Sequence, residues 1–156
     1  MKKTGLIALL SASLLLVSCG GTSYVNEKVD GDNVNRDTLT LYSETFKLES
    51  YAKMSMDAIL VVGPCDYETN VRYEGKLEAT DTENKYKLTY ETVAARAKYE
   101  GEGAYSYKQT TALVLKALGY NDEQIEDVNN NKEVKIDFES TAYVTVNPED
   151  MTWSLL

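Results

Sequence analysis

Apolar residues that alternate with polar ones are the feature that most constrains how this chain folds. From Asp37 onward, short segments repeat this period of two, as in Leu39 and Leu41 followed by Phe46 and Leu48. Such segments, joined by short polar turns, are typical of antiparallel strands with one buried face. We therefore predict a mainly β domain over residues 37–156, with about eight strands in an antiparallel meander. The meander closes into a barrel or a strongly curved sheet.

The first two strands have a register that their own sequence predicts. If the chain folds back at Ser43-Glu44, Leu41 lies opposite Phe46 and Leu39 lies opposite Leu48. The buried face and the strand pairing then agree, which favours this register over a shift by one residue.

A third strand is predicted over residues 53–62. Its second half, which includes Ile59 and Val61, is apolar on both faces. A strand with this pattern is buried on both sides, so we expect another element to cover that end.

The clearest hairpin flanks a turn at residues 81–84. This turn places Leu77 opposite Leu88 and Gly75 opposite Tyr90. An aromatic ring over a glycine stabilises sheets, and a glycine within a strand permits the bend or bulge that closing a sheet requires.

The C-terminal segment is predicted to form the last three strands. One turn is expected at residues 139–141 and another at residues 147–150, and the second would place Val144 opposite Trp153. Every inward side chain would then meet an inward side chain of the neighbouring strand.

Two short helices are predicted before these strands, at about residues 110–128. Gly119 stands where a helix C-cap glycine belongs, and Asn121 with Gln124 has the spacing of a capping box. Each helix is too short to persist alone, so both are expected to pack on the sheet.

The N-terminus has the pattern of an export signal. An apolar run from Leu6 to Val17 follows two lysines and is too short to span about 30 Å of hydrocarbon. Leu16-Val17-Ser18-Cys19 resembles the lipobox of bacterial lipoproteins. The resemblance implies a signal peptide over residues 1–18 and a diacylglyceryl group, often with a further palmitate-type acyl chain, on Cys19. The alternative is an ordinary cleaved signal that leaves Cys19 as a free thiol.

Residues 19–36 are predicted to be the lipidated cysteine and a flexible polar tether, which would hold the domain off the membrane. The resemblance implies a location in the bacterial cell envelope, outside the cytoplasm, on the outer membrane or the cell surface. The formal net charge is −9, and removing the two lysines with the signal would change it to −11. Such a surface repels nucleic acid and anionic lipid headgroups, which argues against both as partners.

The side-chain inventory argues against enzymatic activity. The chain contains no histidine, which removes the usual general base and most zinc or copper sites. Cys65 is the only cysteine besides Cys19, and we interpret it as an inert, partly buried thiol. We predict a non-enzymatic protein with no catalytic residue, no cofactor and no metal.

Two segments resemble a known family. Leu39-Thr40-Leu41-Tyr42-Ser43-Glu44-Thr45-Phe46-Lys47-Leu48 looks like the opening hairpin of small lipocalin-like bacterial lipoproteins. Tyr73-Glu74-Gly75-Lys76-Leu77 is similar to a later hairpin of the same family. The resemblance implies a meandering antiparallel barrel, with or without a cavity, and no single activity.

Tyrosine is the most unusual component, with 12 residues against 2 phenylalanines. Tyrosine rings suit a half-buried sheet and also line ligand sites. If the concave face binds a small apolar or amphipathic molecule, or a peptide, its predicted lining is Tyr67, Val71, Tyr73, Tyr86, Tyr90 and Trp153. The alternative is that these side chains fill a solid core and that the lipoprotein is structural or contacts another envelope protein with its surface.

Overall fold

The computed structural model describes residues 20–156, and its fold is mainly β, as predicted. The prediction of a signal peptide and of lipidation at Cys19 falls outside these residues. In the described part of the chain, seven strands and two helices follow one another. They are β1 (Thr22–Asp30), β2 (Asn33–Leu41), β3 (Thr45–Met56), β4 (Cys65–Ala79), β5 (Lys85–Glu100), α2 (Ala104–Leu118), α3 (Asp122–Asn129), β6 (Val134–Asn147) and β7 (Thr152–Leu155).

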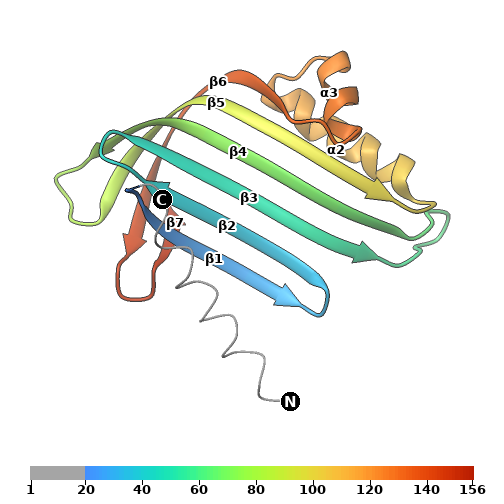
Figure 1. Ribbon diagram of the computed structural model, residues 1–156, viewed down its shortest axis with the longest axis horizontal. Coiled ribbons are helices and arrows are strands. Elements are labelled where there is room, and N and C mark those ends of the chain that lie inside the picture. The colour runs from blue at the N-terminus through green and yellow to red at the C-terminus, as the bar shows by residue number, and fades with distance from the viewer. Residues whose placement is uncertain (1–19) are drawn as a thin grey trace.

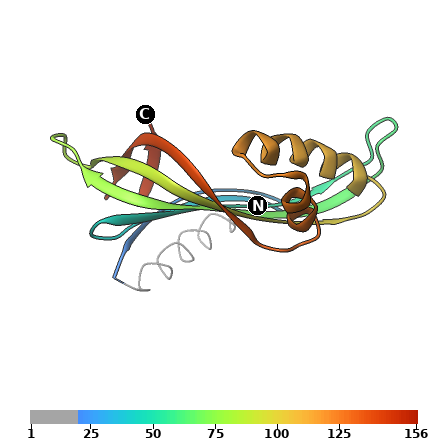
Figure 2. The same ribbon diagram turned by 90° about the horizontal axis from the view of Figure 1, so that it is seen from above.

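The strands form one antiparallel meander in which each strand pairs with the next along the chain. The sheet twists strongly, so that β6 and β7 curl back toward β1 (Figures 1 and 2). The Val25 amide donates to the Met151 carbonyl at 2.7 Å, and the Asn26 side chain donates to the Trp153 carbonyl at 2.7 Å. These contacts bring the two ends of the sheet together in a nearly closed barrel.

A bulge between β4 and β5 supplies part of the curvature. The register of this pair shifts between Glu74 and Gly75, where Gly75 lies opposite Tyr90 as predicted. A Cβ atom on Gly75 would lie 2.0 Å from the Thr89 carbonyl oxygen, so only glycine allows this close approach of the two strands.

The core occupies the concave face of the sheet in two clusters. One cluster centres on Leu39, Leu88 and Val144, which have no exposed surface. The other lies between the sheet and the helices α2 and α3, which cover one end of that face (Figure 2). Tyr73 and Phe138 pack against both clusters, so the apolar interior is continuous.

The helical pair forms as predicted at its centre and C-terminal end. Gly119 adopts a left-handed φ of 106° after α2. The Asn121 and Gln124 side chains make both hydrogen bonds of the capping box at the start of α3. However, α2 begins at Ala104 rather than near residue 110, because β5 ends before Gly101-Glu102-Gly103.

Two predictions about the C-terminal strands are wrong. Residues 139–141 are not a turn, because β6 runs unbroken through them and absorbs the irregularity in a register shift against β5. The helices therefore precede two strands, not three. The last turn extends through Met151, whose φ is 55°, so Val144 lies opposite Leu155 instead of Trp153.

The prediction of a flexible tether over residues 19–36 is also wrong from Thr22 onward. These residues form β1 and the start of β2, which are joined by a turn at Gly31-Asp32. Gly31 has a φ of 60°, a conformation that glycine adopts without steric cost. A glycine followed by an aspartate is a signal for a two-residue hairpin loop, and here it joins two strands that look polar in sequence.

Candidate functional site

Two of the predicted ligand-lining residues of the concave face, Tyr73 and Tyr90, pack against each other and against the core. The Tyr90 ring meets the Phe46 ring edge-on, with centroids 5.1 Å apart, and the Tyr73 ring edge-on at 5.4 Å. Phe138 completes the group, with its centroid 5.7 Å from that of Tyr73. Edge-to-face pairs at these separations are the favourable arrangement of close-packed aromatic rings.

The other predicted lining residues are divided between the two clusters and the far end of the sheet. Tyr86 and Trp153 pack on the first cluster, and Val71 packs on the second. The Trp153 indole donates to the Asp37 carbonyl at 3.2 Å, which fixes its ring at the closure of the barrel. Tyr67 lies apart from them, beside Tyr99 and α2. The six residues therefore do not surround one common space.

Tyr67 belongs to a second aromatic group near the β3–β4 connection. Its ring lies 6.3 Å from the Tyr99 ring and 6.1 Å from the Tyr107 ring, and its hydroxyl lies 3.2 Å from the Met54 sulfur. The Tyr99 hydroxyl lies 2.5 Å from the Thr111 hydroxyl, which joins the sheet to α2. This group fastens the helix to the sheet.

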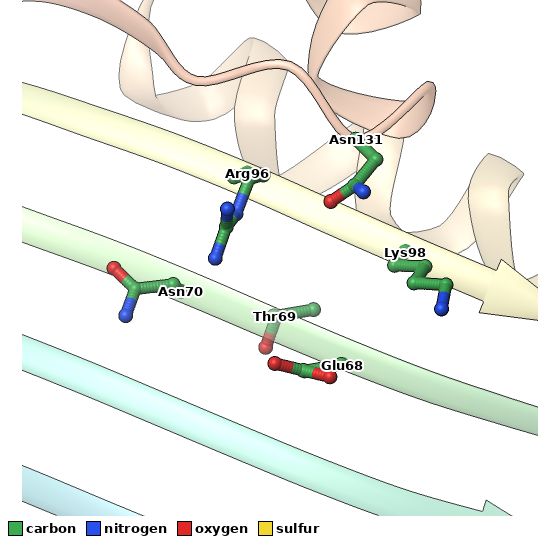
Figure 3. A pocket seen from close by; sticks show the side chains of 6 residues that line it. All are labelled: Glu68, Thr69, Asn70, Arg96, Lys98 and Asn131. Carbon is green, nitrogen blue, oxygen red and sulfur yellow. The ribbon is translucent and has the colours of Figure 1, made fainter.

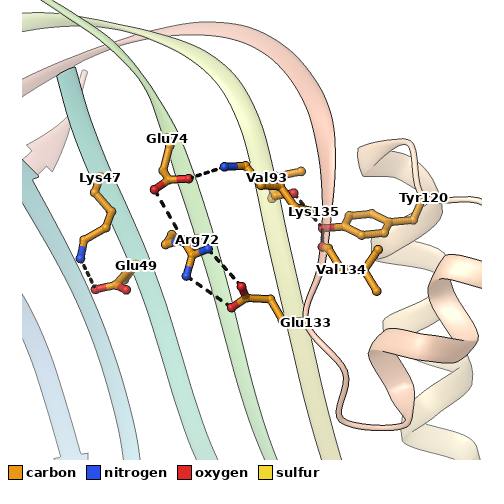
Figure 4. Close-up of polar contacts among 9 residues, drawn as sticks. All are labelled: Lys47, Glu49, Arg72, Glu74, Val93, Tyr120, Glu133, Val134 and Lys135. Atoms are coloured by element: carbon orange, nitrogen blue, oxygen red, sulfur yellow. Dashed lines mark hydrogen bonds and ion pairs between the residues drawn. The ribbon is translucent and has the colours of Figure 1, made fainter. Parts of the chain in front are cut away.

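The buried tyrosines have pKa values that suit structural roles. Burial raises the pKa of Tyr67, Tyr73 and Tyr90 above the ordinary phenol value. Burial also raises the pKa of Tyr120 to about 12, and its hydroxyl lies 3.0 Å from the Val134 carbonyl and 3.2 Å from the Val93 carbonyl (Figure 4). These phenols are protonated at neutral pH, so they can donate hydrogen bonds but are poor bases.

The convex face carries a network of charged side chains. Arg72 forms two hydrogen bonds to the Glu133 carboxylate, at 3.1 and 3.3 Å, and Lys135 contacts Glu74 at 2.8 Å (Figure 4). The bond from Lys135 lowers the pKa of Glu74. Within residues 20–156, no group of three histidine, cysteine or acidic side chains is placed to hold a metal ion.

Two shallow depressions adjoin on this convex face. The smaller, of about 180 Å³, has the lining shown in Figure 3: Glu68, Thr69, Asn70, Arg96, Lys98 and Asn131. The larger, of about 460 Å³, shares Glu68 and Lys98 with it and extends toward Asp32 and Glu100. Their polar, alternately charged lining suits contacts with a polar surface rather than enclosure of an apolar molecule.

The most exposed apolar residues form a knob between β3 and β4. Ile59 and Val62 exchange two backbone hydrogen bonds of 2.9 Å, and the turn between them holds Leu60 and Val61. Leu60 is 100% exposed and Val61 is 99% exposed. The expectation that another element covers this end of the strand is therefore wrong. The strand ends at Met56, and the apolar tip protrudes into solvent.

Helix α2, beside the knob, carries further exposed apolar residues. Figure 2 shows the knob rising on the same side of the sheet as α2. The root of the knob touches the start of the helix, where the Gly103 amide donates to the Pro64 carbonyl at 3.0 Å. We call the exposed apolar residues of the knob and of α2 the distal apolar surface: Ile59, Leu60, Val61, Tyr105, Leu113 and Val114. The sequence signal for the knob is the run that ends at Val62, which is apolar on both faces of the expected strand.

Comparison with known proteins gives no relative for this chain: no family model, no curated protein and no solved structure matches it. Within residues 20–156, no helix has both the length and the apolar character needed to cross a bilayer.

Proposed function

We propose that this protein is a lipid-anchored, non-enzymatic component of the bacterial cell envelope that acts through its outer surface on another envelope protein. In this proposal the barrel is a solid scaffold held outside the cytoplasm by acyl chains on Cys19. It is the second of the two functions that the sequence left open.

The observation that carries the proposal is the packing of the concave face. Tyr90 is 8% exposed and meets the rings of Phe46, Tyr73 and Phe138, so core side chains fill the space beside two of the residues expected to line a ligand cavity. A drug-sized ligand needs a cleft of about 300 Å³ or more, most of it apolar. The depressions on the convex face are lined mostly by charged and neutral polar side chains instead.

The position of β1 supports a close membrane attachment. Only Gly20 and Gly21 lie between Cys19 and Thr22, where β1 begins. An extended chain of this length spans about 10 Å, so an acylated Cys19 would hold the barrel near the headgroups instead of at the end of a long tether. Two or three acyl chains anchor a protein stably, because each buried methylene contributes about 0.8 kcal/mol.

The convex face is the surface we assign to the partner protein. Arg96 and Asn131 border the smaller depression, and Glu68 and Lys98 connect it to the larger one. A surface with both signs of charge and several hydrogen-bonding groups provides specificity and steering in protein complexes.

Titration of the purified protein with a fluorescent fatty acid tests the solid-core part of this proposal, with Tyr90→Ala as the matched variant. A filled concave face predicts no saturable binding to the wild-type protein, and no loss of binding in the variant. Saturable binding to the wild-type protein that weakens in Tyr90→Ala would overturn the proposal and restore the ligand-binding alternative.

A further inference from the structure

The distal apolar surface lies far from the end of the sheet at which the proposed membrane anchor joins the barrel. β1 and β3 run in the same direction, since each pairs antiparallel with β2. β3 begins beside the strand end where β1 begins, and its 12 residues extend about 40 Å to the knob. Figure 1 shows the β3–β4 connection and the start of β1 at opposite ends of the sheet. The anchoring bilayer is therefore a poor occupant for this surface.

The two halves of the distal apolar surface differ in charge. The knob is flanked by exposed acidic residues, Asp57 before it and Glu102 against its root at Gly63. Helix α2 lies in a stretch, residues 103–121, that contains no acidic residue at all. In this acidic chain that stretch carries Lys108 and Lys116 instead. Lys108 lies over the Tyr99 ring, 5.9 Å from its centroid, so Lys116 is the basic residue that borders the exposed side chains of α2. The knob is thus apolar with an acidic border, and α2 is apolar with one basic neighbour.

Helix α2 turns these apolar residues outward. Leu113 and Tyr105 are each 72% exposed, and Val114 is 59% exposed, whereas Leu115 faces the core. Lys116 lies one turn from Leu113 and is only loosely engaged, at 3.5 Å from the exposed Asp122 carboxylate. An exposed pair of this kind contributes little energy, so Lys116 can exchange Asp122 for another carboxylate.

We infer that the distal apolar surface binds a second copy of this chain. In a two-fold symmetric dimer, the knob of each copy packs on α2 of the other, because a surface that meets its own copy must be self-complementary. Leu60 then lies against Leu113 of the other copy, and Glu102 faces Lys116. Burial of the two fully exposed side chains, Leu60 and Val61, supplies the apolar gain.

The knob and the exposed side of α2 around Leu113 make a small interface, at the low end of the size of specific complexes. The dimer is therefore expected to be weak in dilute solution. Its contacts do not depend on the anchor. If the proposed acylation is correct, it confines both copies to one membrane at the same height and raises their effective concentration.

Paired-cysteine cross-linking in cells tests the inference. Full-length chains with Leu60→Cys and with Leu113→Cys, one of them extended by a tag, are expressed together and oxidised in their membranes. We expect a mixed dimer at several times the yield of the 60–60 or 113–113 dimers. The pair Glu83→Cys and Leu113→Cys is the matched control, because Glu83 is exposed in the β4–β5 turn at the other end of the sheet.

The wild-type chain measures the background from native cysteines. Cys65 is buried, and burial raises the pKa of its thiol, so it should form no cross-link. A wild-type dimer through Cys19 would show that this residue is not acylated, which counts against the proposed function and not against the dimer.

Charge reversal supplies the second readout. Glu102→Lys should lower the yield of the 60–113 dimer severalfold, and combining it with Lys116→Glu should restore it. A mixed yield no higher than that of the Glu83 control would overturn the inference, as would adducts of Leu60→Cys only with a different protein. Overturning it in this way leaves the acylation of Cys19 untouched, since that is read separately by mass.

Discussion

Replacing Gly75 by alanine tests the closest approach of two strands in the barrel. The added methyl carbon would lie 2.0 Å from the Thr89 carbonyl oxygen, 2.9 Å from its carbon and 3.0 Å from the Tyr90 Cα. All three atoms belong to the backbone, so no side chain can rotate to make room. β4 and β5 must separate at the bulge, which loosens the contact of Tyr90 with the core.

Two effects determine how far Gly75→Ala lowers the free energy of unfolding. Overpacking of a close-packed site costs about 1–3 kcal/mol, and weakening an adjoining backbone hydrogen bond adds about 1 kcal/mol. We therefore expect Gly75→Ala to lower the free energy of unfolding by about 3 kcal/mol. Gly31→Ala is the matched control, because it has open space around it and pays only about 1 kcal/mol for its left-handed conformation.

Urea unfolding followed by circular dichroism measures both variants, and each reduces the conformational freedom of the unfolded chain equally. The Gly75→Ala midpoint should therefore fall further than that of Gly31→Ala by the equivalent of about 2 kcal/mol, with an unchanged slope. Equal shifts of the two midpoints would refute the packing that we describe between β4 and β5.

Three further predictions concern other parts of the fold. The pKa of Tyr120 is raised to about 12, above the value of about 10 for an unfolded phenol, so its contribution to stability is complete below pH 10 and is lost as the pH rises to 12. The free energy of unfolding of Tyr120→Phe should therefore fall less between pH 10 and pH 12 than that of the wild-type protein. Leu39→Ala should cost about 2–5 kcal/mol because Leu39 is fully buried, whereas Leu60→Ser should leave the unfolding midpoint unchanged because Leu60 is fully exposed. Glu133→Gln should cost less than about 1 kcal/mol, since the ion pair with Arg72 is partly exposed; a larger loss in thermal unfolding would mean that this pair is more buried than we describe.

The strand pairings that sequence predicted share a clear alternation and a short connection. Leu41 with Phe46 and Leu77 with Leu88 pair as expected, because any other register would expose their apolar faces. The capping box at Asn121 was predictable for a similar reason, since its two hydrogen bonds depend only on residues three positions apart.

The errors arose where pairing depends on distant partners. β1 has few apolar residues, and its place in the sheet depends on β2 and on the closure at Met151, neither of which its own sequence reveals. Residues 139–141 contain a serine and a threonine that suit a turn, yet β5 holds them in a continuous strand. Tertiary contacts decided both cases over local preference.

The candidate site also shows what local sequence pattern can predict and what only tertiary packing decides. The alternation placed Tyr73, Tyr86 and Tyr90 on the inner face, but it could not say whether their rings enclose a space or touch. The exposed knob was visible as an apolar run, and the sequence favoured burial because burial is the usual fate of such a run. Only the end of β3 at Met56 shows that the run continues past the sheet.

The central claim is that a folded barrel is attached almost directly to a lipid anchor, and the intact mass of the protein extracted from membranes tests it most directly. We predict the mass of residues 19–156 with a diacylglyceryl group on Cys19, with or without one more acyl chain. A mass that shows residue 19 unmodified, or the first 18 residues still attached, would contradict it.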